Sequence, residues 1–492
     1  MFARDKFNDS SIAPGNVPGG AKWFLAGVPT GLLFLLSTQL EARWFFFLFG
    51  LSLIAMVSVA LPGKKSFYLF CLAFSVPIGI NLHIDLTTSL VYRSTHAFMI
   101  SISHIPMVAL LVIYFYNRFD SNPKTGLPWI NILPLGALIA SSCISMVFNG
   151  EWRFGIFDVY ALFASVVLFV CVSNVVEETR DLRLAVSALV LALAIQAVIA
   201  RAQDWTGSSL GLEFFGSRTV MPGFAGLSSI SRAAGTLFHP NSLALYFDLT
   251  LPLAFSLLFC PMKASGKWLL ASAFALGMLG LFSTLSRGGM FSTLVALTFV
   301  LIVQLRKRIG VFMTGGAVAA AVMVGAVLLL GTPTSIQERF LKHDYGTARG
   351  RLKLMGVTLR LIGSHPLWGT GPNNFVPVAT RYDNTPEQIV VLWNAPVHNL
   401  FFFIAGEIGL VGLVCFCLFF LSVMLSLAPA IRSPDPFLYC TGTGLFFCFL
   451  AFVMHSQVDY CSWTHFVPLW FMAGLAVSAG RIASRSPGAG VI

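Results

Sequence analysis

Charged residues are scarce in this sequence. Asp, Glu, Lys and Arg make up only 10% of the 492 residues, whereas a soluble domain usually carries about 25%. Hydrophobic residues account for 57% of the chain, and Phe alone for 46 residues. So few charges cannot cover a soluble surface, which excludes an ordinary soluble protein. The composition predicts an all-α fold, a polytopic bundle of membrane-spanning helices.

Acidic residues are the scarcer kind of charge, with 20 Asp and Glu against 31 Lys and Arg, giving a net charge of +11. In a soluble protein this excess would suggest nucleic-acid binding. Here the basic residues lie between apolar runs, where membrane topology and anionic lipid head groups account for them. The lipid bilayer is therefore an expected partner, and nucleic acid is not.

The sequence also lacks the usual patterns of metal and disulfide sites. There is no Asp-x-Asp pair, and the nine cysteines lie mostly in or beside apolar runs, without the spacing of a zinc site or a disulfide framework. We expect no metal and no cofactor. The first 22 residues are polar and are not followed by a short apolar region with a cleavage site, so no cleavable signal peptide is expected.

Apolar runs near 20 residues long are abundant, and each is long enough to cross the ~30 Å hydrocarbon core of a bilayer. They predict about 14 transmembrane helices (12–14) in one membrane domain, residues 1–492. A break at Ser286–Gly289 or one continuous helix both fit the stretch 268–305. The predicted spans are 23–40, 44–63, 67–84, 97–116, 130–148, 157–176, 184–205, 243–259, 268–283, 290–305, 311–331, 400–425, 437–455 and 467–483.

The distribution of Lys and Arg between these spans predicts that both termini are cytoplasmic. Two long loops, 206–242 and 332–399, then lie together on the outer face. Long connections without a packing duty tend to carry function. Functional residues are therefore expected in these two loops and at the span ends beside them.

The 332–399 loop contains a predicted helix over 348–362, preceded by a capping-box pattern that begins at Ser335. Arg349, Lys353 and Arg360 share one face of this helix, and an apolar face lies about a third of a turn away. Such a helix suits the membrane surface. Its arginines either anchor it to head groups or bind a substrate phosphate.

Further polar residues lie at the junctions with the spans. The loop 332–399 ends in Pro396-Val397-His398-Asn399, and Glu407 follows inside the next span, where a carboxylate is costly and usually faces a partner or a cavity. The other loop ends with Arg232, His239 and Asn241, and Arg287 lies at a further outer junction. Each residue also has a structural explanation: an arginine that anchors at the interface, a hydrogen-bonded histidine, or a helix cap at His239-Pro240-Asn241.

Taken together, these segments resemble a known family. The run Arg349-Gly350-Arg351, then His365-Pro366-Leu367-Trp368-Gly369-Thr370-Gly371, then Val397-His398-Asn399-Leu400 and Gly406-Glu407-Ile408-Gly409-Leu410 is similar to the signature region of the O-antigen ligase and polymerase superfamily. The segments 232–241 and 286–289 resemble upstream motifs of the same superfamily. The resemblance covers about residues 230–410.

The resemblance implies a metal-independent, inverting glycosyltransferase of the bacterial inner (cytoplasmic) membrane, with a large helical periplasmic loop. Its donor would be an undecaprenyl-diphosphate-linked oligosaccharide, its acceptor a lipid-linked glycan or lipid A-core, and its further partners other polysaccharide-export proteins. By motif, His398 would be the catalytic base. Diphosphate-binding candidates are Arg232, Arg287, Arg349 and Arg351, and supporting candidates are Asn399, His239, Asn241 and Glu407.

The chemistry of these residue types agrees with that implication. A sugar hydroxyl is a poor nucleophile, and a histidine is suited to removing its proton near neutral pH. Arginines can stabilise the charge that develops on a diphosphate leaving group. Asn399 would orient His398 or cap the next helix. A retaining mechanism would instead need a carboxylate nucleophile, for which the outer candidates are Asp344, Asp383, Glu387 and Asp459.

Within the family, the segment 232–241 favours a polymerase of exopolysaccharide or O-antigen repeat units over an O-antigen ligase. Two other classes remain as alternatives. A membrane transporter would suit the many spans, and it predicts discontinuous helices with a site near the middle of the membrane. A non-catalytic scaffold of a secretion complex would leave the arginine and histidine positions unexplained.

Overall fold

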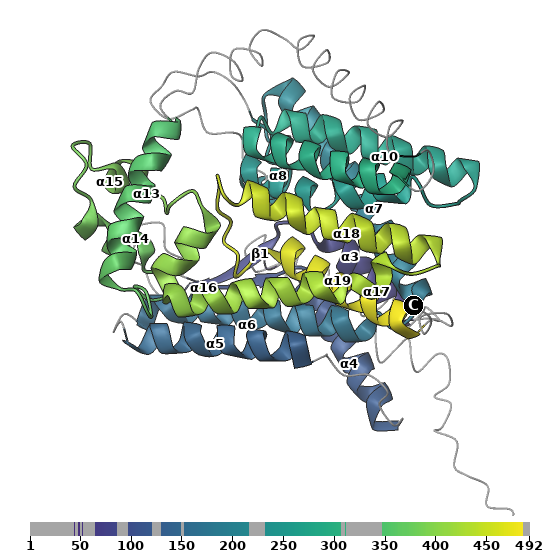
Figure 1. Ribbon diagram of the computed structural model, residues 1–492, viewed down its shortest axis with the longest axis horizontal. Coiled ribbons are helices and arrows are strands. Elements are labelled where there is room, and N and C mark those ends of the chain that lie inside the picture. The colour runs from purple at the N-terminus through teal and green to yellow at the C-terminus, as the bar shows by residue number, and fades with distance from the viewer. Residues whose placement is uncertain are drawn as a thin grey trace, which may run out of the picture. The chain divides into compact units, whose positions relative to one another are not determined.

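The computed structural model describes residues 64–85, 97–120, 129–148, 152–215, 232–306 and 347–485, together with isolated positions at 44, 48, 49, 52 and 310. The chain divides into two compact units, Met1–Phe67 and Tyr68–Ile492. The second unit contains all of the long helices among the described residues. Its described residues are mostly helical, as predicted (Figure 1).

The elements follow one another in a simple order. They are α3 (Lys64–Ser75), β1 (Asn81–Asp85), β2 (Ala97–Ser101), α4 (His104–Asp120), α5 (Trp129–Phe148), α6 (Trp152–Val175), α7 (Thr179–Thr206), η1 (Glu213–Phe215), α8 (Pro240–Asp248), α9 (Leu251–Leu257), α10 (Ala264–Ser283), a helix over Arg287–Arg306, α13 (Thr347–Ser364), α14 (Phe375–Ala379), η2 (Thr380–Tyr382), α15 (Ile389–Trp393), α16 (Leu400–Ser426), α17 (Ala428–Ile431), α18 (Pro436–His455) and α19 (Val467–Arg485).

Eight of the described helices are long and apolar enough to cross a membrane: α5, α6, α7, α10, the helix Arg287–Arg306, the α16–α17 stretch, α18 and α19. Each corresponds to a predicted span. The predicted break near Ser286 is also present, because α10 ends at Ser283 and the next helix begins at Arg287. The chain is therefore a multi-pass membrane protein.

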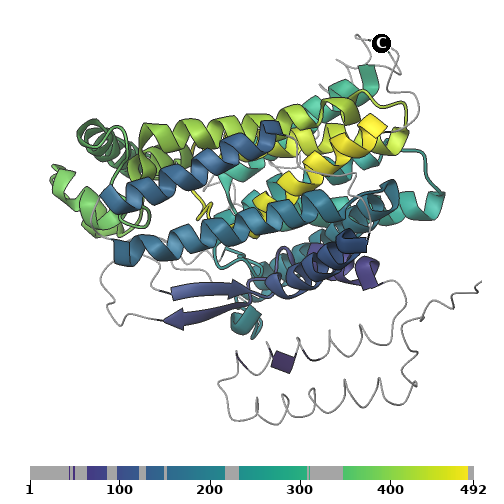
Figure 2. The ribbon, with the colours of Figure 1, turned by 90° about the horizontal axis from the view of Figure 1, so that it is seen from below.

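Three predicted spans are wrong in form. Residues 67–84 and 97–116 each combine a helix with one strand of an antiparallel hairpin, in which Asn81 pairs with Ser101 (Figure 2). Residues 243–259 form two short helices, α8 and α9, and Pro252 opens the second, where its missing N–H does no harm. Hydropathy records the apolar run but not these interruptions. Predicted spans 23–40 and 311–331, and nearly all of 44–63, lie outside the described residues, so a count of about 14 is not confirmed.

Small residues allow the long helices to approach one another closely. Helix α10 lies against α7, α16 against α5, α19 against α6 and α18 against α9. At Gly280 of α10, an added Cβ would come within 2.8 Å of the Cα of Ala197 in α7. Contacts of this kind are the usual way in which helices associate in lipid, where burial of apolar surface gives no extra drive.

Helix α16 is broken at Gly409, whose φ of 73° and ψ of 179° are not helical. The loop before α14 fills the break. Thr370 N donates to Gly406 O, Gly371 N donates to Glu407 O, and Leu410 N donates to Pro366 O, all at 2.8–2.9 Å. A break in an apolar helix is tolerated when protein groups satisfy the freed backbone. The Gly-Thr-Gly turn at 369–371 therefore supports α16, and its backbone N–H groups at 370 and 371 are used for that purpose.

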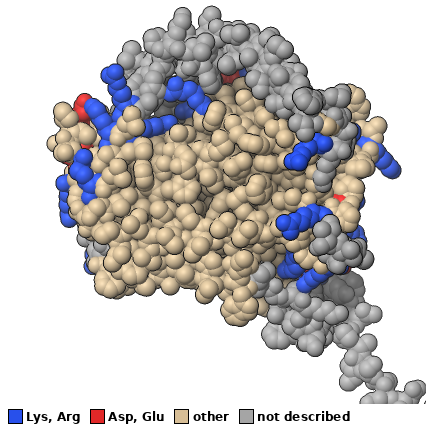
Figure 3. All heavy atoms as spheres, in the orientation of Figure 1, with Lys and Arg blue, Asp and Glu red and all other residues tan. Residues whose placement is uncertain are grey.

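Charged side chains are distributed unevenly over the surface. On the face shown in Figure 3, Lys and Arg gather near the end formed by α13–α15 and again near the opposite ends of the long helices, with a broad uncharged belt between them. This pattern is typical of a protein whose long helices cross a membrane. The two basic ends mark the two interfaces.

Candidate functional site

The segment that joins α18 to α19, residues 456–466, lies between the predicted motif regions. Leu400 N donates to Ser456 O at 2.9 Å, and Asn399 Nδ2 donates to Gln457 O at 3.0 Å. Tyr460 of the same segment contacts His398. The start of α16 is thus attached to the end of α18, although 58 residues separate Asn399 from Gln457 along the chain.

The predicted catalytic residue, His398, is half-buried between two aromatic rings. The ring of Trp393 lies 5.5 Å away and that of Tyr460 5.6 Å away, both edge to face. Trp393 is in turn held by α13, because a Cβ added at Gly350 would lie 2.1 Å from its Cζ2. Glycine at 350 therefore lets α13 approach the ring that orients His398.

Asn399 caps α16. Its Oδ1 accepts hydrogen bonds from Phe401 N and Phe402 N, both at 3.0 Å, while its Nδ2 donates to Gln457. An asparagine at this position satisfies backbone donors that a helix start leaves open. The helix-cap explanation is therefore the correct one for Asn399, and the cap fixes the backbone next to His398.

Asp459 is the electrostatic centre of the segment 456–466. Burial alone would raise the pKa of the Asp459 carboxyl, but the charges of His398, Arg351, His455 and His239 hold it below its usual range. An ionised Asp459 thus faces groups from both motif regions. In the sequence, Asp459 is only one outer carboxylate candidate among several, since no local motif surrounds it.

Arg232, His239 and Asn241 form a connected group. Arg232 donates from Nε to Thr284 O at 3.0 Å and from Nη2 to Asn241 Oδ1 at 2.6 Å. His239 Nδ1 accepts from Asn241 N at 3.2 Å and caps α8. The predicted alternative of a helix cap is correct for His239. Arg232 fastens the start of α8 to the turn that leads into Arg287.

Arg287 is exposed and is the first residue of the helix Arg287–Arg306. The N-terminus of a helix attracts anions through its backbone N–H groups and its dipole. The following glycines lie against His455, since a Cβ at Gly288 would be 2.8 Å from Cδ2 and one at Gly289 would be 3.1 Å from Cε1 of that ring. Glycine at both positions brings this helix start close to the end of α18.

A buried cluster beneath this turn was not predicted. His455 Nδ1 lies 2.6 Å from Asp248 Oδ2, and His455 Nε2 lies 3.2 Å from Ser286 Oγ. Asp248 Oδ1 accepts further bonds from Ser292 at 2.8 Å and Thr293 at 2.6 Å. All of these side chains are at most 5% exposed. The cluster joins α8, α18 and the helix Arg287–Arg306, and so holds Arg287 in place.

The basic face of α13 is partly occupied by local contacts. Lys353 pairs with Glu387 at 2.6 Å, and Arg360 Nε donates to Tyr382 O at 3.1 Å. Arg351 is half-buried and acts on Asp459, whereas Arg349 is exposed. Of the predicted phosphate ligands on α13, Arg351 therefore lies with the site.

The remaining outer carboxylates have local duties. Asp383 accepts hydrogen bonds from Thr385 N, Thr385 Oγ1 and Val390 N, at 2.6–3.0 Å. Burial alone would raise the pKa of Asp383, but these bonds keep it below its usual value. Asp383 thus orders the loop after η2, and Asp344 lies outside the described residues.

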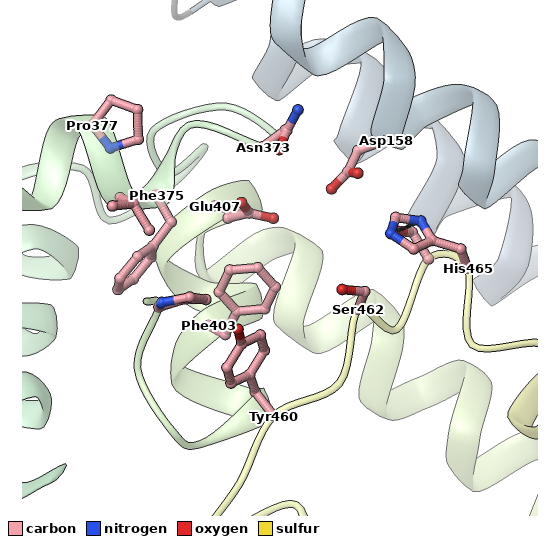
Figure 4. Close-up of a pocket in the computed structure, with 12 residues that line it drawn as sticks. Asp158, Asn373, Phe375, Pro377, Phe403, Glu407, Tyr460, Ser462 and His465 are labelled. Atoms are coloured by element: carbon pink, nitrogen blue, oxygen red, sulfur yellow. Dashed lines mark hydrogen bonds between the residues drawn. The ribbon is translucent and has the colours of Figure 1, made fainter. Parts of the chain in front are cut away.

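Glu407 lies apart from His398, in a pocket. Its carboxylate accepts hydrogen bonds from the backbone N–H groups of Asn373 and Phe375. Across the pocket lies Asp158 of α6, another buried carboxylate, and Figure 4 shows both pointing into the same space. Asp158 was not predicted, because it stands alone in an apolar run.

Comparison with known proteins gives a family match to one part of the chain. No curated protein matches the chain. Residues 272–417 match the O-antigen ligase family. The match includes Arg287, Arg351, His398 and Glu407, and it ends before His455 and Asp459. The matched segment covers less than a third of the chain, and together with the eight apolar helices among the described residues it supports a relationship to the O-antigen ligase and polymerase superfamily.

Proposed function

We propose that the chain transfers a glycan from undecaprenyl diphosphate to an acceptor hydroxyl on the periplasmic face of the bacterial inner membrane. The observation that carries this proposal is the convergence at Asp459. The charges of His398 and Arg351 from one motif region, and of His239 and His455 from the other, all act on this one carboxylate. This convergence supports a site in which His398, the proposed base, and Arg351, one of the proposed leaving-group cations, act near one another.

Arg287 binds the diphosphate. It is exposed at a helix N-terminus, where its guanidinium and the helix dipole favour the same anion. Arg232 acts beside it by holding the Thr284 carbonyl, and Arg351 approaches from α13. These cations stabilise the charge that develops on the departing phosphate oxygen, so the proposed mechanism uses no metal.

His398 removes the proton of the acceptor hydroxyl as its oxygen attacks the anomeric carbon. The bond from that carbon to the phosphate oxygen breaks at the same time, and undecaprenyl diphosphate leaves. A single displacement of this kind inverts the configuration. The imidazolium that forms is stabilised by the ionised Asp459.

The remaining expectations belong to this proposal. A polymerase of lipid-linked repeat units is preferred to a ligase that uses lipid A-core, on the strength of the segment 232–241. A topology with cytoplasmic termini and with the loops 206–242 and 332–399 in the periplasm would give His398 and the arginines access to the donor.

Purified protein in detergent tests the proposal. It receives a synthetic undecaprenyl-diphosphate oligosaccharide with EDTA present, with and without lipid A-core, alongside a His398→Ala variant of equal thermal stability. Lengthened lipid-linked glycan without lipid A-core indicates a polymerase, and product only with lipid A-core indicates a ligase. His398→Ala should reduce the rate by about 10²–10⁴-fold. Equal rates for both proteins would refute the role of His398.

One observation favours a transporter as the second candidate. Helix α16 is interrupted at Gly409 next to a buried carboxylate, and transporters often bind their substrates at broken helices. Proteoliposomes loaded with the lipid-linked oligosaccharide distinguish the two functions. Movement of the donor between leaflets without any new glycosidic bond would favour transport.

A further inference from the structure

The pocket beside Glu407 lies next to His398 but takes no part in the proposed chemistry. It is bounded by α6, by α16, by the loop before α14, and by the segment 456–466. Tyr460 separates it from the base, with ring centroids 5.6 Å from His398 and 5.5 Å from Phe403. Pro396, two residues before His398, also lines it. Only the ring of Tyr460 would therefore lie between a ligand in the pocket and His398.

The pocket opens to solvent on one side. About 480 Å³ of space lies between its walls, and this figure includes the part that is open to solvent. Ser462 is exposed at the edge, while Asp158 and Glu407 are 7% and 4% exposed in the interior. The polar groups thus lie at the mouth and at the bottom.

One of these polar groups, the Asp158 carboxyl, has an oxygen without a hydrogen-bond partner. Within the part of the chain that the structure describes, Asp158 Oδ1 is buried and has no hydrogen-bond partner. Figure 4 shows its carboxyl group directed into the pocket, toward that of Glu407. A buried polar atom without a partner is costly, by about 1–3 kcal/mol. A ligand that donates hydrogen bonds here would remove that cost.

The walls indicate the chemistry of the ligand. Two buried carboxyl groups present several acceptor oxygens, so Asp158 and Glu407 suit a molecule with several donors. The residues that line the pocket include no arginine or lysine, whereas the arginines proposed for the diphosphate lie elsewhere. Phe375, Phe403 and Tyr460 supply apolar faces in the same pocket. A sugar ring, with hydroxyl donors around its edge and C–H groups on its faces, meets both requirements.

We propose that this pocket is a sugar subsite, which holds a pyranose of the glycan so that its reacting end lies at His398. The proposal rests on the proposed glycosyltransferase function. The same chemistry would suit a sugar of the donor or of the acceptor. A subsite deep in the pocket would explain why α16 is broken at Gly409, since the break places Glu407 against the loop that carries Asn373 and Phe375.

The test uses the full-length protein in detergent and the free repeat-unit oligosaccharide, released by mild acid from the cell's own lipid-linked glycan. This probe carries neither lipid nor diphosphate. Saturation-transfer NMR measures its binding to the wild type and to three variants, Asp158→Asn, Phe403→Leu and Ser462→Ala. Ser142→Ala is the matched control, because that hydroxyl bonds only to Leu138 O within α5. Thermal unfolding confirms that each variant is folded.

We expect the wild type and Ser142→Ala to bind the probe, and Asp158→Asn and Phe403→Leu to weaken it at least tenfold, with a smaller effect for Ser462→Ala. Transfer assays then show a matching rise in KM. A rise for the acceptor alone places the acceptor's sugar in the pocket, and a rise for the donor alone places the donor's sugar there.

The subsite would be overturned by unchanged binding and KM in all three folded variants, or by tight binding of Ca²⁺ that depends on Asp158 and excludes the probe. If active wild type fails to bind the probe, the subsite is wrong and the transferase stands. If the probe binds at Asp158 but the wild type transfers nothing, the transferase is wrong and the subsite stands.

Discussion

The two sides of the segment 456–466 bury carboxylates in opposite ways. On the side of His455, Asp248 is bonded to His455, Ser292 and Thr293. On the side of His398, Asp158 Oδ1 has no partner among the described residues and faces a pocket. A fully bonded carboxylate holds helices together, whereas an unbonded one beside empty space is suited to a ligand. The first side is therefore a fixed frame for Arg287, and the second is a place for substrate.

The largest effect is expected on the stability of the protein when the two carboxylates, Asp248 and Asp158, are mutated in turn. Asp248→Ala leaves His455 without its partner inside the helix bundle, which typically costs about 3–5 kcal/mol. Asp158→Asn removes no hydrogen bond at Oδ1 and should leave unfolding nearly unchanged. Thermal unfolding in detergent measures both. Equal losses of stability would show that the two sites have the same structural duty.

Gly350→Ala affects the side of His398 alone. The added Cβ would meet the ring of Trp393, which must move and take its contact with His398 along. A shift of this size should lower kcat by about 10–100-fold. Gly363→Ala on the same helix is the control, because nothing lies within 4 Å of its added Cβ. Similar rates for the two variants would show that the position of Trp393 does not affect catalysis.

A smaller change tests whether the His455 side positions Arg287. Ser286→Ala removes the bond to His455 Nε2, at a cost of about 1 kcal/mol. We expect KM for the donor to rise a few-fold while kcat changes little. Thr298→Ala, an exposed hydroxyl on the same helix, is the reference. A fall in kcat without any change in KM would mean that the cluster does more than hold the arginine.

The smallest effect concerns pH. The lowered pKa of Asp459 keeps it ionised in neutral and mildly acidic solution, so its stabilising contribution is lost only as pH falls through that low value. An Asp459 that becomes protonated no longer stabilises the imidazolium, so the wild-type rate should have an acid limb at that low pH. Asp459→Asn should abolish this limb, and Asp459→Glu should keep it. An acid limb that is the same in Asp459→Asn as in the wild type would show that Asp459 does not act on His398.

Several features were predictable from short stretches of sequence. The eight long helices follow from apolar runs of the right length. The break before Arg287 lies next to the predicted one at Ser286–Gly289, although both glycines lie inside the following helix. The cap at Asn399 and the helix over 348–362 are equally local. Local patterns failed where an apolar run contained a turn, as at Pro252 and in the hairpin of β1 and β2.

The sequence by itself therefore determined the membrane class, the resemblance to one family and the main candidates His398 and Arg287. Hydrophobic runs and family motifs are short-range signals, which a linear reading detects. Only the tertiary structure decided that Asp248 meets His455, 207 residues later, and that Asp158 faces the same pocket as Glu407. Each of these residues is isolated among apolar neighbours in the sequence. The reason for burying its charge appears only when distant helices pack together.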